Sequence, residues 1–266
     1  MSLPTIWIVG DWQAPDFADA IEAVRSSFIC RCFDSANAAR ANSPAANELV
    51  PAAILLVQSR PGQLLFSSIE RLHAQFPLAR LIALTGPWCE GELRSGRPVP
   101  GIVRVPWRNW QVALKQQLEI ACCATAPLPR TATPTDYIES STSAIRRSQP
   151  RDGVAVICTH TLANYGYLAD AVRRLGLTAM RHDRAQPIPC PAKAIIFDGW
   201  ESASAFAMTN ERANGNSLPA RVLILHFPRP EDHVLARQAG IAAVLGFPLL
   251  LPELAAALST SLKQAA

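Results

Sequence analysis

Short apolar runs alternate with amphipathic stretches through the first half of the chain. The uninterrupted apolar runs are typical of strands buried on both faces of a parallel sheet. Between them, apolar residues recur at a spacing of three and four, which indicates helices. The predicted strands are residues 5–9, 29–33, 53–57, 80–84 and 102–105, and the predicted helices are 15–28, 61–76 and 107–123, with a weak helix within 35–50.

The same alternation returns in the second half. The predicted strands are residues 154–158, 178–181, 194–197, 222–225 and 241–245, and the predicted helices are 162–175, 200–214, 230–239 and a last one after 246–248. Strands that alternate with helices form parallel sheets through right-handed crossovers, with helices on both faces. We therefore predict the α/β class, with two doubly wound five-stranded parallel-sheet domains, and the repetition itself supports this architecture.

The pattern breaks between the two halves. The stretch from Ala126 to Asp152 carries four prolines and a Ser/Thr-rich middle, which is typical of a linker. We place the first domain at residues 1–124, the linker at 125–150 and the second domain at 151–266.

Composition narrows the classes of function. An apolar content of 49% supports a large core, and a net charge of +4 without a Lys/Arg cluster does not indicate a nucleic-acid partner. Seven cysteines without a C-x-x-C motif suggest a reducing cytoplasm. The N-terminal stretch MSLPTIWIVGDW lacks the features of a secretory signal, and no apolar run reaches the ~20 residues of a membrane span, so we expect a cytoplasmic protein without membrane contact.

Motifs of known enzyme chemistry are missing from the sequence. It has no H-E-x-x-H, G-x-S-x-G or P-loop, and Gly10 is not part of a G-x-G-x-x-G. The histidines are scattered. We predict no catalytic residue, no metal and no cofactor, and we favour a role other than catalysis while leaving that question open.

The stretch ARVLILHFPRPEDHVLARQAGIAAVLGFPLLLPELAAALS, residues 220–259, resembles the last third of a bacterial response-regulator receiver domain, a CheY-like and flavodoxin-like fold. There an Ala-Gly-Ile/Ala pair leads into a strand that ends in Lys-Pro and then a Leu-rich helix. The resemblance covers most of both halves and excludes the linker. It implies two-component signal transduction, in which an acidic pair binds Mg²⁺, an Asp accepts a phosphoryl group, and a Ser/Thr and a Lys hold the phosphoryl oxygens.

The second half departs from that pattern at most of these positions. Asp198 stands where the phosphoacceptor belongs, but Thr159 and His160 replace the acidic pair, His226 lies near the Ser/Thr position, and Phe247 replaces the Lys. The resemblance therefore implies a pseudo-receiver. Asp198 is either phosphorylated or caps the helix that follows it, and we favour the cap.

The first half is also incomplete. Asp11 keeps one acid, Gln58 or Ser59 stands at the phosphoacceptor position, Thr85 matches the Ser/Thr, and Val105 precedes Pro106 in place of the Lys. The resemblance implies a second pseudo-receiver, with Asp11 and Thr85 as residual motif positions.

The loop from Thr85 to Trp110 is rich in Trp and Arg and follows a strand end, where doubly wound folds gather ligands. It is either a binding surface for a protein or an anionic ligand, or a loop packed on its own domain. The candidate binding residues are Trp88, Glu90, Glu92, Arg94, Arg97, Arg104, Trp107 and Trp110.

Three functions compete. The favoured one is a non-catalytic signalling or scaffold protein, in which two pseudo-receivers bind protein partners through this loop and through the helix 4–strand 5–helix 5 faces. A homodimer is one option. The alternatives are a small-molecule binder or enzyme with a site in the cleft between two α/β domains, and a phosphorylation switch at Asp198.

Overall fold

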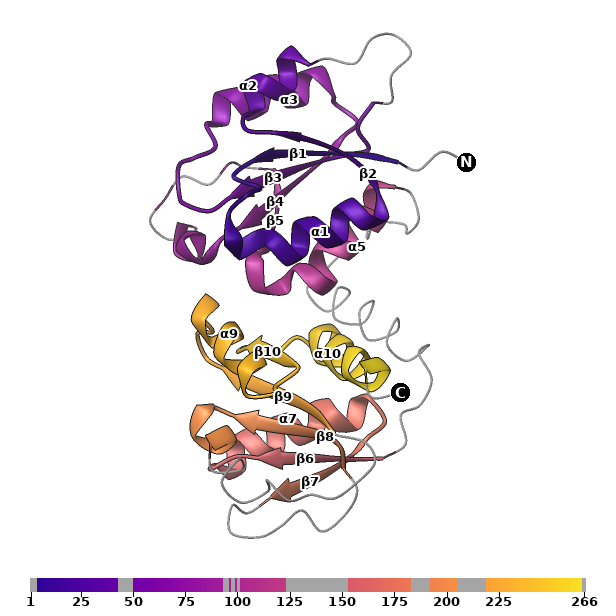
Figure 1. Ribbon diagram of the computed structural model, residues 1–266, viewed down its shortest axis with the longest axis vertical. Coiled ribbons are helices and arrows are strands. Elements are labelled where there is room, and N and C mark those ends of the chain that lie inside the picture. Colours follow the sequence, from indigo (N-terminus) through magenta and orange to yellow (C-terminus); the bar gives the residue numbers. More distant parts are fainter. Residues whose placement is uncertain are drawn as a thin grey trace. The chain divides into compact units, whose positions relative to one another are not determined.

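The computed structural model describes residues 4–42, 50–92, 96, 99, 101–122, 153–182, 192–204 and 219–264, with side chains up to residue 259. The chain divides into two compact units, Met1–Pro127 and Leu128–Ala266. Each unit contains a five-stranded sheet in which every pairing is parallel (Figure 1). The predicted fold class is therefore confirmed. The predicted linker, 125–150, lies outside the described residues.

The sheet of the first unit has the strand order β2-β1-β3-β4-β5. Its central strands are almost completely buried, because helices cover both faces and apolar side chains fill both sides. The strands are β1 (Thr5–Gly10), β2 (Ile29–Phe33), β3 (Ala53–Gln58), β4 (Arg80–Thr85) and β5 (Val103–Pro106).

The helices of the first unit lie on opposite faces of this sheet (Figure 1). On one face, α1 (Ala18–Ser27) and α5 (Lys115–Ala121) cover Ile6, Ile8 and Leu55. On the other face, α2 (Ala36–Ala41) and α3 (Phe66–Gln75) cover residues that alternate with these, such as Trp7. The alternation along each strand thus supplies two cores.

Three of the helices predicted from the sequence begin later than expected. The stretch predicted as a helix over 15–28 opens with a 3₁₀ turn at Pro15–Phe17, so α1 begins at Ala18. The stretch after Pro61 turns at Gly62, whose φ is +78°, and the Gln63 side chain accepts a hydrogen bond from the backbone N–H of Arg60 (2.9 Å), so α3 begins only at Phe66. The stretch predicted as one helix over 107–123 opens with a 3₁₀ turn and a π turn before α5. These turns bring Trp107 and Trp110 against the core.

The second unit repeats the topology of the first. Its strand order is β10-β9-β8-β6-β7, and its first strand, β6, lies between the second and third strands just as β1 does. The strands are β6 (Val154–Cys158), β7 (Thr178–His182), β8 (Ala192–Asp198), β9 (Ala220–Leu225) and β10 (Ala243–Gly246).

The helices of the second unit also form two layers. One layer, α7 (Leu162–Arg174) and α10 (Leu251–Gln264), shares a core with Ile157 and Val222. The other contains α9 (Pro230–Gln238), which buries Ala236. The helix predicted over 200–214 is seen from 200 to 204, and the rest of it lies outside the described residues.

Helix ends follow local chemistry. The Thr161 hydroxyl caps α7 by accepting from the backbone N–H of Asn164 (3.2 Å), Pro230 occupies the first turn of α9, and Gly240 follows α9 with a φ of +70°. None of the helices within the described ranges is both long and apolar enough to cross a bilayer.

Gly10 offers a direct test of the first unit. Its φ is +111°, and a Cβ atom added there would lie 2.3 Å from the Val57 carbonyl oxygen. We expect Gly10→Ala to lower the free energy of unfolding by about 3 kcal/mol, since it adds a backbone clash to strain. Gly62→Ala, at φ +78° in open space, should cost only about 1 kcal/mol. Urea unfolding measures both, and equal losses would contradict the close approach.

Candidate functional site

The residues singled out by sequence gather at the carboxyl edges of the two sheets. Parallel pairing brings all strand ends of one sheet to the same edge, and register places Gln58 opposite Thr85 and Asp198 opposite Ile224. Asp11 follows β1 directly, and its backbone N–H donates to the Val57 carbonyl (3.0 Å). Each unit thus has one candidate site at this edge.

Asp198 is the centre of the site in the second unit. Its Oδ2 atom accepts from the Thr159 hydroxyl (2.5 Å) and from the Asn164 amide (2.8 Å). Thr159 follows β6 and is buried, and Asn164 lies in the first turn of α7. Asp198 therefore ties β8 to the β6–α7 connection. Neither partner belongs to the helix that begins at Trp200, which the sequence predicted it would cap.

Aromatic side chains occupy the neighbouring edge of the second unit. Phe247, at the position of the receiver lysine, stacks on His226 with ring centroids 4.9 Å apart and an interplanar angle of 21°. The ring centroids of Tyr167 and Phe247 lie 5.6 Å apart, and the Tyr167 hydroxyl donates to the Leu249 carbonyl (3.1 Å). His160 Nε2 lies 3.5 Å from a carboxylate oxygen of Glu201. This edge thus offers aromatic surface where a receiver offers a cation.

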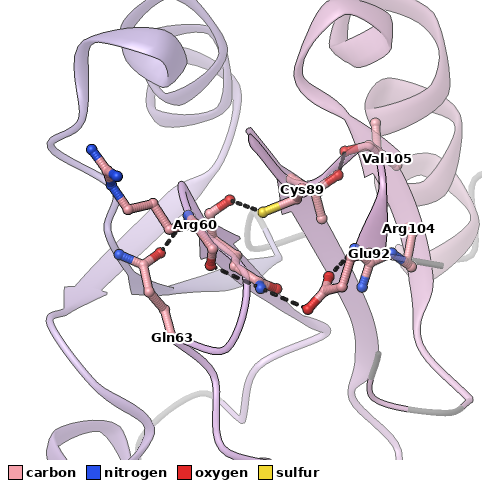
Figure 2. Close-up of polar contacts among 8 residues, drawn as sticks. Arg60, Gln63, Cys89, Glu92, Arg104 and Val105 are labelled. Atoms are coloured by element: carbon pink, nitrogen blue, oxygen red, sulfur yellow. Dashed lines mark hydrogen bonds and ion pairs between the residues drawn. The ribbon is translucent and has the colours of Figure 1, made fainter. Parts of the chain in front are cut away.

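In the first unit, Gln58, which with Ser59 is one of the two residues that the resemblance places at the phosphoacceptor position, is held in place by a loop residue. Its Nε2 atom donates to Glu92 Oε1 (3.2 Å) and to the Arg60 carbonyl (3.0 Å). Glu92 is only 6% exposed, and its other carboxylate oxygen lies 2.5 Å from Arg104 (Figure 2). The Gln58–Glu92–Arg104 chain therefore fastens the loop after β4 to the ends of β3 and β5.

Neighbouring contacts fill the rest of this edge. The Cys89 thiol contacts the Gln58 carbonyl at 3.5 Å, and the Thr85 hydroxyl contacts the Val105 carbonyl at 3.5 Å (Figure 2). The Ser59 hydroxyl donates to Asp11 Oδ2. Thr85 and Asp11, the residual motif positions, thus bond to neighbours within their own unit.

The structure divides the candidate binding residues of the 85–110 loop. Trp107 is buried and Trp110 packs against the same core, so both tryptophans support their own unit. Trp88 is 69% exposed, with the Arg60 guanidinium 5.6 Å from its ring. Arg94 and Arg97 lie outside the described residues. A partner-binding role for this loop stays a prediction, and among the tryptophans it rests on Trp88.

An exposed ion pair of this loop joins Glu90 to Arg108.

Across the part of the chain that the structure describes, no group of three or more His, Cys, Asp or Glu side chains could hold a metal ion.

Sequence reasoning missed Asn164 as the second partner of Asp198. The available signal was its place in the first turn of a helix that begins at the sheet's carboxyl edge.

Three of the thiols, those of Cys30, Cys32 and Cys89, are poor nucleophiles. Burial raises the pKa of Cys30 to about 11, with the nearby Cys32 adding to the shift, and burial likewise raises the pKa values of Cys32 and Cys89. At neutral pH these side chains stay protonated, whereas the thiolate is the reactive form. Nucleophilic or redox chemistry at these cysteines is therefore disfavoured.

Comparison with known proteins assigns no family. No family model and no curated protein matches the chain. Similar solved structures include a "putative two-component system response regulator/ggdef domain protein" (16% identity, TM-score 0.37) and a "probable two-component system response regulator/GGDEF domain protein" (14%, 0.39), each covering 98% of this chain and 99% of the other. A third, the "XylFII-LytSN complex", shows 8% identity and a TM-score of 0.29 over 100% of this chain and 96% of the other. These values are too low to transfer a residue role or an activity.

The Glu92–Arg104 pair should stabilise the first unit. Arg104→Met leaves the Glu92 carboxylate buried without its cation, so we expect a loss of about 3 kcal/mol in the free energy of unfolding. Arg108→Met, which removes the cation of the exposed Glu90 pair, should cost less than about 1 kcal/mol. Equal losses of unfolding free energy in the two variants, measured by chemical denaturation, would contradict a larger stabilisation by the buried pair.

The raised thiol pKa of Cys30 predicts a pH dependence of stability. The unfolded thiol loses its proton near its ordinary value of 9.0, and the folded one only near 11, so the contribution of Cys30 is complete below pH 9 and falls between pH 9 and 11. We expect Cys30→Ala to lose stability less steeply than the unsubstituted protein over that window. Urea unfolding at each pH measures the free energy of unfolding of both proteins. The same pH dependence in both would contradict the raised pKa of Cys30.

Proposed function

We propose that this protein is a non-catalytic signalling or scaffold protein that acts by protein–protein contact. The observation that carries the proposal is that hydrogen bonds within the second unit occupy the Asp198 carboxylate. Its carboxylate bonds to Thr159 and Asn164, and the aromatic Phe247 stands where a receiver has its lysine.

Phosphoryl transfer depends on positive charge at the phosphoryl oxygens and on a metal ion that aligns them. Thr159 replaces an acid that would bind Mg²⁺ and uses its hydroxyl to bind Asp198 instead. Hydrogen bonds that stabilise the carboxylate also make it a weaker nucleophile. The site therefore favours an unmodified Asp198.

The first unit supports the same proposal. Gln58 has a neutral amide that cannot form an acyl phosphate in the way an Asp carboxylate does. Its amide is also held by Glu92 and the Arg60 carbonyl. A fold that keeps the receiver-like sheet but fills its reactive edge is suited to presenting a fixed surface.

The second unit presents apolar side chains on and beside α9, the helix that precedes its fifth strand, β10. Val234 and Leu235 on α9 are each 52% exposed, Phe227 before α9 is 84% exposed, and Leu250 before α10 is 47% exposed. Exposed apolar groups of this size, close along the chain, are typical of interaction surfaces. They belong to the helix 4–strand 5–helix 5 region that the sequence indicated as a contact face.

The charges of α9 favour a second copy of this chain as the partner. Glu231 and Arg237, both exposed, lie three residues on either side of Val234. If two copies of α9 pack antiparallel about a twofold axis at Val234, Glu231 of each faces Arg237 of the other. An isologous interface of this kind is self-complementary in charge and in apolar surface.

A phosphorylation switch at Asp198 is the second candidate. It is favoured by the single fact that an acid stands at the phosphoacceptor position, at the end of β8. Asp198 would have to release Thr159 and Asn164 before it could react, which makes this candidate weaker.

Self-association can be measured by sedimentation velocity over a concentration series. We expect Leu235→Asp to weaken dimerisation by at least about tenfold, because it places a charge among the apolar side chains next to the twofold axis at Val234. Leu162→Asp is the matched control, since Leu162 is 71% exposed on α7 of the same unit, and it should leave dimerisation unchanged.

Charge reversal gives a second readout. Glu231→Arg alone should weaken the dimer, and Glu231→Arg with Arg237→Glu should restore it. A protein that stays monomeric throughout, or equal effects of the Leu235 and Leu162 variants, would overturn the second copy as partner.

A further inference from the structure

A pocket of about 660 Å³ with both polar and apolar lining lies within the first unit, where the chain leaves β1 and β2 and approaches α3. The strand order reverses direction between β1 and β3, and such switch points are the usual ligand sites of doubly wound sheets. The volume falls in the range of roughly 300–1,000 Å³ found for small-molecule sites. Neither the residues at the phosphoacceptor positions nor those of the α9 surface line this pocket.

Two carboxylates stand at this pocket. The left-handed turn at Gly10 lets the Asp11 N–H bond to Val57, which fixes the start of the β1–α1 connection over β3. Parallel register pairs Val9 with Phe33, so Asp34 leaves β2 at the same level as Gly10 leaves β1. Asp11 and Asp34 both line the pocket as a result.

Among the described residues that line the pocket, none is a Lys or Arg. The other polar side chains of this lining are neutral, with the amides of Gln13, Asn37 and Gln63 foremost. Arg60, from the adjacent β3–α3 connection, stacks its guanidinium on Trp88. An anionic ligand would therefore face two carboxylates without compensation.

The remaining wall is apolar. Leu64, Leu65 and Ile69 line it from the start of α3, and Leu65 is 66% exposed, a large apolar side chain at the mouth of a charged pocket. A bare metal ion would not use this wall. Divalent cations such as Ca²⁺ and Mg²⁺ also need about six oxygen ligands, and no cluster of three acidic or other metal-ligating side chains occurs in the described part of the chain.

We propose that this pocket binds a small organic cation, an aliphatic amine whose ammonium groups pair with Asp11 and Asp34 and whose carbon chain lies on Leu64 and Leu65. The neutral amides accept hydrogen bonds from further N–H groups of the ligand. The combination of a pocket of about 660 Å³, two carboxylates that no Lys or Arg of its described lining compensates, and an apolar wall carries the assignment; the acid pair alone would not.

Isothermal titration calorimetry of the full chain at low salt tests the assignment with three aliphatic amines: spermidine, agmatine and putrescine. At least one should bind with a Kd below about 1 mM. Triethylene glycol, a neutral chain of similar length, and Mg²⁺ alone should give no saturable heat at the same concentrations.

Substitutions locate the site. Asp34→Asn should weaken amine binding by about tenfold, since it removes one of two charges without altering side-chain shape. Asp170→Asn, at an exposed i,i+4 pair with Arg174 in the second unit, is the matched control and should leave binding unchanged. Ser68→Trp, which fills the pocket from α3, should abolish binding, with circular dichroism confirming the fold.

Four outcomes overturn the proposal. They are an absence of binding by all three amines, equal affinity in Asp34→Asn and Asp170→Asn, saturable binding of triethylene glycol at the affinity of the amines, and saturable binding of Mg²⁺ that depends on Asp34. Each is independent of whether the protein dimerises through α9, so failure here leaves the proposed function intact.

Discussion

Parallel pairing of short apolar strands is the constraint on which the rest of the structure depends. Buried strands such as β1 and β3 can satisfy their backbone groups only by pairing with neighbours, and parallel pairing requires a helical crossover between consecutive strands. The crossovers fill both faces with helices and leave the carboxyl edge for loops. Asp11, Gln58 and Thr85 meet in one unit, and Asp198 meets Thr159 in the other, because the topology brings these chain positions to one edge.

Both units hold the polar side chain at the carboxyl edge of their sheet with hydrogen bonds from within the unit. In the second unit the Asp198 carboxylate accepts hydrogen bonds from internal donors, and in the first unit the neutral amide of Gln58 is held by Glu92 of a buried ion pair. Both arrangements satisfy polar groups at this edge within the protein. Such networks rigidify the loops that surround them, and rigid loops suit a protein that works through contact surfaces.

The fold could be read from the sequence because apolar runs and turn residues are local signals. Strands such as Ile29–Phe33 and Val154–Cys158 have the bounds that the pattern predicted. The sequence did not predict the later start of α3. A Pro often begins a helix, but here Gly62 and Gln63 form a turn first. The helix at 107–123 was only partly right, since hydrophobic spacing does not distinguish α from 3₁₀ or π turns over a few residues.

The candidate site was less predictable. Motif positions identified Asp198 and Thr85, but the partners that decide their chemistry are set by tertiary contacts. Asn164 is 34 residues from Asp198, and Glu92 is 34 residues from Gln58. The composition of the 85–110 loop suggested a binding surface, whereas Trp107 and Glu92 turned out to be buried in their own unit. The pocket of the first unit arises from three separate strand–helix connections, and no single stretch of sequence reports it.

Incubation of the full chain with acetyl phosphate and Mg²⁺, followed by intact-mass spectrometry, tests the central claim most directly. The account predicts no phosphoryl adduct, because Thr159 and Asn164 hold the carboxylate and Phe247 supplies no cation. A stoichiometric adduct that disappears in Asp198→Asn would contradict it and would establish Asp198 as a working phosphoacceptor.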